Sequence, residues 1–265
     1  LKGRFGEKGF IYAGNSHDDI AVWRHSKEQV VVNASKSTLK KLQKIEKTFI
    51  NFVKKNISLR SLIKLFRIHQ WSKNVLIFFP LIAAPQFFNF ENMGMLVLAF
   101  FVFGICASST YIINDILDIE NDRLHKTKKF RPFAAGTIPA IFSLSALIIL
   151  PISIFFAGFI SINFMLLIMM YILITLSYSI YLKTLPIIDC LVLASLYTIR
   201  IVGGALVISS TLSFWLLGFS LMFFFSLSLL KRYAEIPFSD KPNQEILFGR
   251  GNEIRDYPLI LNMGV

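Results

Sequence analysis

The chain has 265 residues, of which 54% are hydrophobic and 17% charged, and it contains 27 Phe. This composition is typical of a membrane protein and excludes the class of ordinary soluble globular proteins. The net charge of +12 does not require a nucleic acid partner, because basic loops on one side of a membrane account for it. We therefore predict an integral membrane protein that contacts membrane lipids and no nucleic acid.

Two short apolar runs in the first part of the chain are typical of strands. F-I-Y-A-G at 10–14 predicts a buried strand, and V-V-V-N at 30–33 predicts a second, parallel one. Between them, a Gly-Asn turn leads to the start of a helix that carries Asp18 and Asp19. We predict a small α/β unit at 1–35.

The turn and helix start resemble the last catalytic motif, G-D-x-x-x-D, of haloacid-dehalogenase-like phosphatases. Asn15 stands where the first Asp is usual, and Asp19 matches the second. The resemblance implies acidic groups that hold Mg²⁺, but no Asp-x-Asp nucleophile of that family is matched. A domain of that type also needs a much longer chain to bury a core. We therefore expect a catalytically silent remnant, and the alternative is an ordinary α/β turn capped by Asn15.

Residues 36–65 combine apolar steps of three and four with a dense basic face, which predicts an amphipathic helix and linker. Such a helix lies on an anionic membrane surface. The alternative is a solvated helix that docks on the rest of a phosphatase-like domain. The basic residues of this stretch are Lys36, Lys40, Lys41, Lys44, Lys47, Lys54, Lys55, Arg60 and Lys64.

The remaining residues, 66–265, carry apolar runs long enough to cross a membrane, for which about 20 residues are needed. A shorter run at 74–90, interrupted by Pro80 and Pro85, predicts a first, kinked span. A further span begins at Tyr257 and is cut by the end of the sequence. Cys106 and Cys190 fall within spans, where they are expected to be packing residues. The long runs lie near 94–113, 138–158, 160–182, 187–208 and 212–230.

The basic residues between the spans predict the orientation. The connections near 85–93, 158–163 and 208–213 contain no Lys or Arg. By the positive-inside rule, the opposite, basic connections face the cytoplasm of a bacterial-type plasma membrane, together with the N-terminus. Those connections carry Arg123, Lys126, Lys128, Lys129, Arg131, Lys183, Lys231, Arg232, Lys241, Arg250 and Arg255.

The most informative motif is N-D-I-L-D-I-E-N-D at 114–122. Steps of about four residues place its acidic and amide groups on one helical stripe, where carboxylates repel one another unless a cation lies between them. Hard oxygen ligands suit Mg²⁺, which often completes its shell with substrate phosphates. Anion-binding groups follow at once in K-K-F-R-P-F-A-A-G. We predict catalytic and metal-binding roles for Asn114, Asp115, Asp118 and Asp122, with Lys128 and Arg131 at the phosphates.

This motif, followed by Arg131-Pro132-x-x-x-Gly136, resembles the first aspartate-rich signature of the UbiA family of intramembrane prenyltransferases. The resemblance covers about 66–265. It implies an all-α polytopic bundle of about nine spans, of which about six complete ones fall in this chain, with a Mg²⁺-diphosphate site at its cytoplasmic mouth. The predicted fold is therefore an all-helical membrane domain preceded by a small α/β remnant.

Single polar residues within apolar spans are costly and suggest function. Asp189 and Arg200 lie almost three turns apart on one face, about 16 Å along the axis, too far for an ion pair. Arg200 is the strongest candidate for a substrate or supporting contact, and its alternative is bonding to helix carbonyls or a water pocket. Lys183 and Tyr178 could reach the same mouth. Gly203 and Gly204 are expected to allow close helix packing.

The second acidic motif of the family is reduced here to K-R-Y-A-E-I-P-F-S-D at 231–240, with only Glu235 and Asp240 acidic. Together with I-D-C, Y-T-I-R and G-G-A, this looks more like the polyprenyl-phosphate phosphoribosyltransferase branch. The resemblance implies phosphoribosyl pyrophosphate as donor and a lipid phosphate as acceptor, with Lys231 and Arg232 at a phosphate. In either branch Mg²⁺ and basic groups stabilise the leaving diphosphate.

Two alternatives remain. A prenyltransferase would attach a prenyl chain from a prenyl diphosphate to an aromatic or tetrapyrrole acceptor. A transporter would also place Asp189 and Arg200 within the membrane, but the chain shows no internal repeat and its acidic cluster lies at a span end. The sequence predicts neither the lipid chain length nor an oligomeric state.

Overall fold

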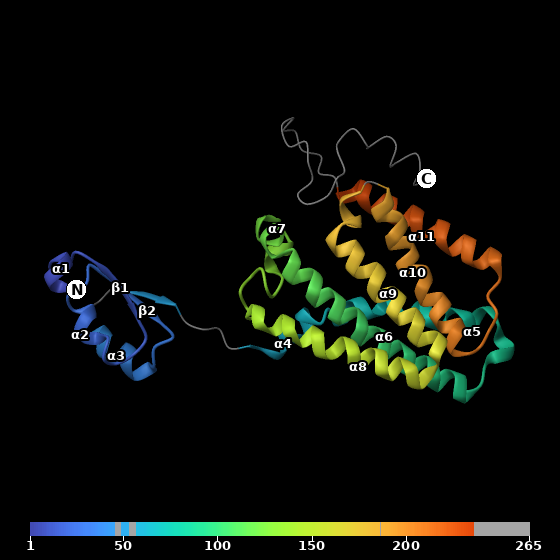
Figure 1. Ribbon diagram of the computed structural model, residues 1–265, viewed down its shortest axis with the longest axis horizontal. Helices are drawn as coiled ribbons and strands as arrows, with labels where there is room; N and C mark the ends of the chain where they lie inside the picture. The colour runs from blue at the N-terminus through green and yellow to red at the C-terminus, as the bar shows by residue number, and fades with distance from the viewer. Residues whose placement is uncertain (46–48, 53–56, 186, 236–265) are drawn as a thin grey trace. The chain divides into compact units, whose positions relative to one another are not determined.

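A computed structural model describes residues 1–45, 49–52, 57–185 and 187–235 (Figure 1). The chain divides into two compact units, Leu1–Asn56 and Ile57–Val265.

The first unit is a small three-stranded parallel sheet with the order β1-β2-β3. Its core is formed by Trp23, Val31 and Leu42, which are fully buried, with Ile20 beside them. The parallel strands predicted on either side of the turn are confirmed. The elements are α1 (Lys2–Phe5), β1 (Ile11–Gly14), α2 (Ile20–Trp23), β2 (Glu28–Val32), α3 (Lys36–Ile45) and β3 (Ile50–Phe52).

The turn after β1 is organised by the carboxylate of Asp19. It accepts hydrogen bonds from the backbone N–H groups of Asn15, at 2.8 Å, and Ser16, at 2.7 Å, and from the Tyr12 hydroxyl, at 2.9 Å. The bond from Ser16 is the main cause that lowers the pKa of Asp19. A Cβ on Gly14 would lie 2.5 Å from Cγ of Asp19, so the turn requires glycine. The resemblance of this turn to phosphatases stays a prediction.

The amphipathic helix and linker predicted for 36–65 is not helical throughout, and its contact with a membrane surface stays a prediction. The segment forms α3, then β3, and then α4 (Leu59–Leu65) in the second unit. The apolar side of α3 packs within the first unit, where Leu42 is fully buried against the sheet core. The chain divides after Asn56 and not after residue 35. The β-branched and aromatic residues of β3 favour pairing with β2 over extension of the helix.

The second unit is a helical bundle. Among the described residues, five of its helices are long and apolar enough to cross a membrane, as predicted for the five long runs. The elements after α4 are η1 (Ile68–Phe78), α5 (Phe79–Ala83), η2 (Pro85–Phe87), α6 (Phe90–Leu117), α7 (Ile119–Leu124), η3 (Lys128–Phe130), η4 (Ala140–Leu144), α8 (Ser145–Ile160), α9 (Ile162–Ile180), η5 (Leu182–Thr184), α10 (Ile188–Val207) and α11 (Phe214–Glu235).

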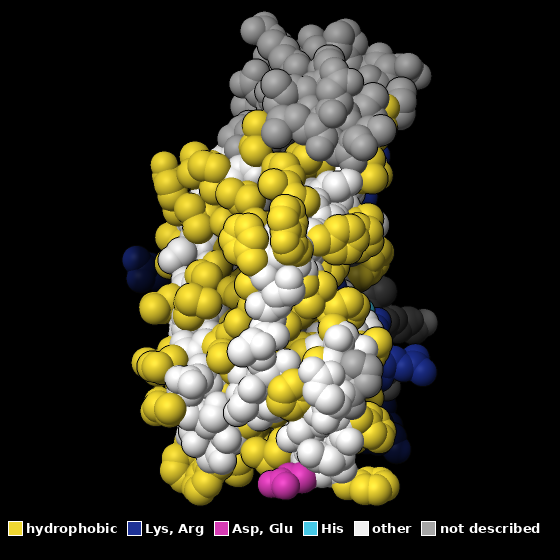
Figure 2. Space-filling model, turned by 90° about the vertical axis from the view of Figure 1, so that its right-hand side faces the viewer, with side chains coloured by type: hydrophobic (Ala, Val, Ile, Leu, Met, Phe, Trp, Pro, Cys, Tyr) yellow, Lys and Arg dark blue, Asp and Glu magenta, His cyan; other side chains and the backbone are white. Residues whose placement is uncertain are grey.

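The outer surface of this bundle is apolar. Figure 2 shows hydrophobic side chains distributed over much of the described part of the face that it presents, which suits contact with lipid tails. Large side chains such as Phe155, Phe159 and Met222 are exposed. Inside, Phe103, Phe164 and Tyr171 form the centre of the core. Together with the apolar lengths of the helices, this indicates an integral membrane protein.

The first, kinked span predicted at 74–90 takes a shorter form. The chain makes a 3₁₀ helix, η1, followed by the short helix α5, which begins with Pro80 in its first turn. Ile77 of η1 is fully buried, and its carbonyl oxygen would lie 1.9 Å from a Cβ on Gly204 of α10. The packing role predicted for Gly204 is thereby confirmed. The span predicted from Tyr257 lies outside the described residues.

Both cysteines are buried and unpaired, as predicted. Cys106 of α6 belongs to the main core, and Cys190 of α10 packs against Leu229 of α11.

Candidate active site

The predicted single stripe of carboxylates is interrupted. Helix α6 ends at Leu117, and Asp118, with φ of −95° and ψ of 8°, separates it from α7. The Asp118 side chain makes no capping hydrogen bond to the backbone, because its carboxylate accepts from Lys183 instead. Asp115 and Asp122 are both buried, whereas Asp118 is partly exposed. The motif is therefore a bent segment in which each carboxylate has its own surroundings.

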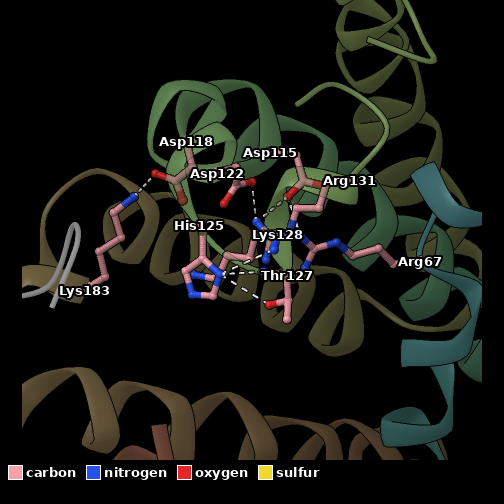
Figure 3. A network of polar contacts seen from close by, with 9 residues as sticks. All are labelled: Arg67, Asp115, Asp118, Asp122, His125, Thr127, Lys128, Arg131 and Lys183. Carbon is pink, nitrogen blue, oxygen red and sulfur yellow. Dashed lines mark hydrogen bonds and ion pairs between the residues drawn. The ribbon is translucent and has the colours of Figure 1, made fainter. Parts of the chain in front are cut away.

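A single guanidinium joins the two buried carboxylates (Figure 3). Nη1 of Arg131 donates to Oδ1 of Asp115 at 3.1 Å and to Oδ2 of Asp122 at 2.6 Å. Arg67, which precedes η1, donates to the same Oδ1 of Asp115. Two of the predicted metal ligands, Asp115 and Asp122, thus contact one predicted phosphate ligand, Arg131, directly.

Arg131 reaches this place because its loop folds back on itself. Its carbonyl accepts from the backbone N–H of Ala135 at 2.8 Å, and Gly136 has φ of 64°, a conformation that favours glycine. Phe133 and Ile138 are then buried against Ile112 of α6. The R-P-x-x-x-G pattern is therefore a tight turn that returns the arginine to the aspartates.

The third carboxylate belongs to a different pair. Nζ of Lys183, in η5, donates to Oδ1 of Asp118, 65 residues away in the chain. This contact confirms that Lys183 reaches the mouth formed by the aspartates. Beside it, Nδ1 of His125 accepts from the backbone N–H of Thr127, at 3.2 Å, and of Lys128, at 3.4 Å (Figure 3). Lys128 thus lies in the same loop, whose shape His125 supports.

The donor set fits a hard divalent cation, although the side chains now bind one another. Carboxylate and amide oxygens are the ligands that Mg²⁺ prefers, and Oδ2 of Asp115 is buried without a hydrogen-bond partner. Two carboxylates already converge on one positively charged nitrogen. Across the described part of the chain, no three acidic, His or Cys side chains come together as a ready metal cluster. A metal ion would have to displace Arg131 from between Asp115 and Asp122.

A second buried ion pair joins α10 to α11. Nε of Arg232 donates to Oδ2 of Asp189 at 2.6 Å, and its Nη2 lies 3.3 Å from the Tyr178 hydroxyl. Arg232 is buried, whereas Lys231 is exposed. Arg232, expected beside Lys231 at a phosphate, is thus held by Asp189 because the α11 helix turns the two neighbours to different faces. The side chain of Glu235 and all of Asp240 lie outside the described residues.

Arg200 is buried in the middle of the bundle and is not paired with Asp189, as predicted. Its Nε donates to Oδ1 of Asn74, in η1, at 3.0 Å, and its Nη1 donates to the carbonyl of Leu196. The guanidinium carbon lies 5.0, 5.5 and 5.8 Å from the ring centres of Phe103, Tyr171 and Tyr197.

No functional role was predicted for Arg67, Asn74 and His125 of these networks, or for Lys73, whose Nζ lies 5.5 Å from the ring centre of Tyr197. The run W-S-K-N at 71–74, in which polar residues directly precede an apolar stretch, was the available signal. Arg67 also has a φ of 47°, and such strain in a non-glycine residue often accompanies a functional site. That conformation is visible only in the structure.

These contacts gather the predicted basic connections at one end of the bundle. Lys183 ties the α9–α10 connection to the end of α6, and Arg232 ties the end of α11 to the start of α10. Figure 1 shows the end of α6, the start of α10 and the end of α11 at the same end of the second unit.

Comparison with known proteins gives the family. The UbiA prenyltransferase family matches residues 75–237, which is more than half of the chain. The chain belongs to the UbiA family. A family assignment of this extent leaves no support for the transporter alternative.

This UbiA chain is similar in sequence to two curated relatives and in fold to one solved structure. It is 37% identical to the protein y4nM of Sinorhizobium fredii over 97% of the chain and 50% of the relative. It is 34% identical to decaprenyl-phosphate phosphoribosyltransferase of Mycobacterium tuberculosis over 69% of the chain and 63% of the enzyme. The chain thus spans one half to less than two thirds of these relatives.

The solved structure is that of a UbiA homolog from Archaeoglobus fulgidus bound to DMAPP and Mg²⁺. It shares 18% identity with a TM-score of 0.55, over 64% of this chain and 62% of that one. This likeness confirms the UbiA-like helical fold of the second unit.

Proposed function

We propose that this UbiA chain carries the diphosphate-binding part of a Mg²⁺-dependent membrane transferase. The reaction would transfer 5-phosphoribose from phosphoribosyl pyrophosphate to a polyprenyl phosphate. The named phosphoribosyltransferase relative supports this choice of substrates, and so does the replacement of a second aspartate-rich motif by K-R-Y-A-E at 231–235, in which Lys231 is exposed.

The contact of Arg131 with both Asp115 and Asp122 is the observation that carries the proposal. It places acidic groups suited to a metal ion and basic groups suited to a phosphate within hydrogen-bond distance of each other. Such a mixture suits a metal diphosphate, in which the ion takes the carboxylates and the phosphates take the basic groups.

The residues divide into two roles. Asn114, Asp115, Asp118 and Asp122 would hold Mg²⁺, which when bound neutralises the negative charge that develops on the leaving diphosphate. Arg131, Lys183 and Lys128 would hold the phosphates, with Arg131 suited to two-point binding. The apolar bundle would exclude water from the cationic carbon that the departing diphosphate leaves behind. Lys231 would add positive charge at the same end.

Prenyl transfer is the second candidate, because the similar Archaeoglobus structure holds a prenyl diphosphate with Mg²⁺. The aspartate site would serve both reactions, since each releases a diphosphate. The acceptor distinguishes them: a phosphate oxygen in one reaction, an aromatic or tetrapyrrole group in the other.

The test is a product assay with the purified full-length protein, Mg²⁺, phosphoribosyl pyrophosphate and a polyprenyl phosphate. We expect a lipid-linked phosphoribose, identified by mass. Asp115→Asn and Asp118→Asn should each lower turnover about a hundredfold or more, because each removes a charged metal ligand. Glu120→Gln, an exposed carboxylate in the same segment, should retain activity.

Circular dichroism should show retained helix content in every variant. Consumption of prenyl diphosphate with an aromatic acceptor, and none of phosphoribosyl pyrophosphate, would select the second candidate. Full activity of both aspartate variants would overturn the site.

A further inference from the structure

Two cations of the second unit, Lys73 and Arg200, form no ion pair with an acidic side chain among the described residues. The charged groups that act on Lys73 are Arg200, Lys231 and Arg67, all of them cations. In the described part of the bundle, no carboxylate lies within ion-pair distance of Lys73 or Arg200. The other buried or half-buried arginines differ: Arg67 and Arg131 bind Asp115, and Arg232 binds Asp189.

An unsatisfied donor, the side-chain amide of Asn74, follows Lys73 in the chain and belongs to a residue that contacts Arg200. Asn74 is 1% exposed, and its Oδ1 accepts from Arg200. Its Nδ2 is buried and has no hydrogen-bond partner. A buried donor without an acceptor is unfavourable, so the amide is a candidate to bind a ligand oxygen. Lys73, Asn74 and Arg200 thus offer donors to an anion and no free acceptor.

The surroundings are aromatic. Phe103, Tyr171 and Tyr197 surround the guanidinium of Arg200, and Nζ of Lys73 lies 5.5 Å from the ring centre of Tyr197. Cation–π contacts offset only part of the cost of a buried charge. A phosphate group with an apolar tail satisfies both features, because its oxygens meet the cations and its tail meets the rings and the apolar bundle.

We propose that Lys73, Asn74 and Arg200 form a second anion site, separate from the aspartate site, that takes the phosphate head group of a lipid. If the proposed function holds, this lipid is the polyprenyl phosphate acceptor, and the identification of the lipid rests on that function. The highly charged donor then occupies the aspartates, and the amphiphilic acceptor occupies the aromatic site.

Arg67 interacts with both the aspartate site and the proposed lipid phosphate site. It binds Asp115, its guanidinium lies 4.9 Å from the ring centre of Tyr111, and its charge acts on Lys73. Lys73 stacks on Tyr197, which lies almost one turn nearer to the start of α10 than Arg200. A phosphate bound at Lys73 therefore faces the aspartate end of the bundle. From there, its oxygen would attack the donor bound at the aspartates.

The experiment measures equilibrium binding to the purified full-length protein in detergent. The probes are geranylgeranyl phosphate, geranylgeraniol and phosphoribosyl pyrophosphate. Lys73→Gln should raise the Kd for geranylgeranyl phosphate roughly ten- to a hundredfold, as expected when a charged hydrogen bond is lost. It should leave the Kd for geranylgeraniol and for phosphoribosyl pyrophosphate unchanged. Lys64→Gln, which removes an exposed charge from α4, is the matched control.

Asn74→Asp separates binding from packing. The new carboxylate keeps an acceptor for Nε of Arg200, so a purely structural role predicts an unchanged or raised melting temperature and unchanged binding. The anion site predicts loss of geranylgeranyl phosphate binding in a folded protein, because the carboxylate repels the phosphate and satisfies the cations.

Wild-type affinity for geranylgeranyl phosphate in both variants would overturn the proposal. Weakened binding of phosphoribosyl pyrophosphate alone would assign the site to the donor and refute the lipid assignment. If the wild-type protein binds no phosphoribosyl pyrophosphate but shows Lys73-dependent binding of the lipid phosphate, the proposed donor fails and the lipid site stands.

Discussion

At the scale of single residues, the second unit pairs its buried acids with cations from distant segments. Asp115 meets Arg67 and Arg131, Asp118 meets Lys183, and Asp189 meets Arg232. Removal of one partner from such a buried pair leaves an uncompensated charge, which is costlier than loss of the contact itself. The structural and catalytic roles of such residues can therefore be separated by substituting two adjacent residues, one buried and one exposed, and comparing the losses of stability and of substrate binding.

Lys231 and Arg232 offer that comparison. Arg232→Ala should lower the free energy of unfolding by about 3–5 kcal/mol, because Asp189 stays buried without its partner. Lys231→Ala, at an exposed position, should cost about 0.5 kcal/mol or less and should instead weaken substrate binding. Chemical unfolding in detergent, followed by circular dichroism, measures both losses.

The double variant Asp189→Leu/Arg232→Met is the control for this pair. It removes both charges and should recover much of the lost stability. Equal losses in Arg232→Ala and Lys231→Ala would show that the Asp189 pair does not stabilise the bundle.

At the scale of elements, the fold depends on how closely η1 approaches α10. Gly204 faces the carbonyl of Ile77 at a distance that admits no side chain. The approach brings Asn74 of η1 to Arg200 of α10 and Lys73 of η1 to Tyr197 of α10, so the packing of two elements creates the proposed lipid phosphate site.

Gly204→Ala should therefore lower the free energy of unfolding by about 1–3 kcal/mol, as overpacking does. Gly218→Ala in α11 is the matched control, because a Cβ there meets no atom within 4 Å. Alanine favours a helix interior over glycine by about 0.5–1 kcal/mol, so the control should be neutral or stabilising. If both variants unfold at the wild-type denaturant concentration, the close approach of η1 and α10 is refuted.

The helices and strands also differ in how well the sequence predicted their type and bounds. The α6, α8, α9, α10 and α11 helices follow from long apolar runs, since a membrane span is a local property of about 20 residues. The helix predicted over the α3–β3 segment was wrong in part. An amphipathic stripe indicates that one face of a helix is buried, but it does not indicate which part of the protein or membrane buries it. The partner, the core around Trp23 and Val31, comes from a different part of the chain.

At the scale of the whole molecule, the basic connections predict that the aspartate site faces the cytoplasm. A cysteine at Lys126 should react with an impermeant thiol reagent only from the cytoplasmic side, and a cysteine at Phe88 only from the outside. Both positions are exposed, and labelling of inverted and right-side-out vesicles measures the difference.

The native Cys106 and Cys190 are buried, so the unmodified protein should stay unlabelled and serve as the control. Labelling of both engineered positions from the opposite sides would reverse the orientation and place the aspartates across the membrane.

The sequence by itself determined the membrane class, the five long spans, the aspartate motif and its family, because composition, span length and motif spacing are local properties. Only the tertiary structure decided which charges meet. Asp118 and Lys183 are 65 residues apart, and Asn74 and Arg200 are 126 apart. Their contacts follow from how the helices pack, and that packing also broke the predicted stripe at Asp118 and buried Arg232.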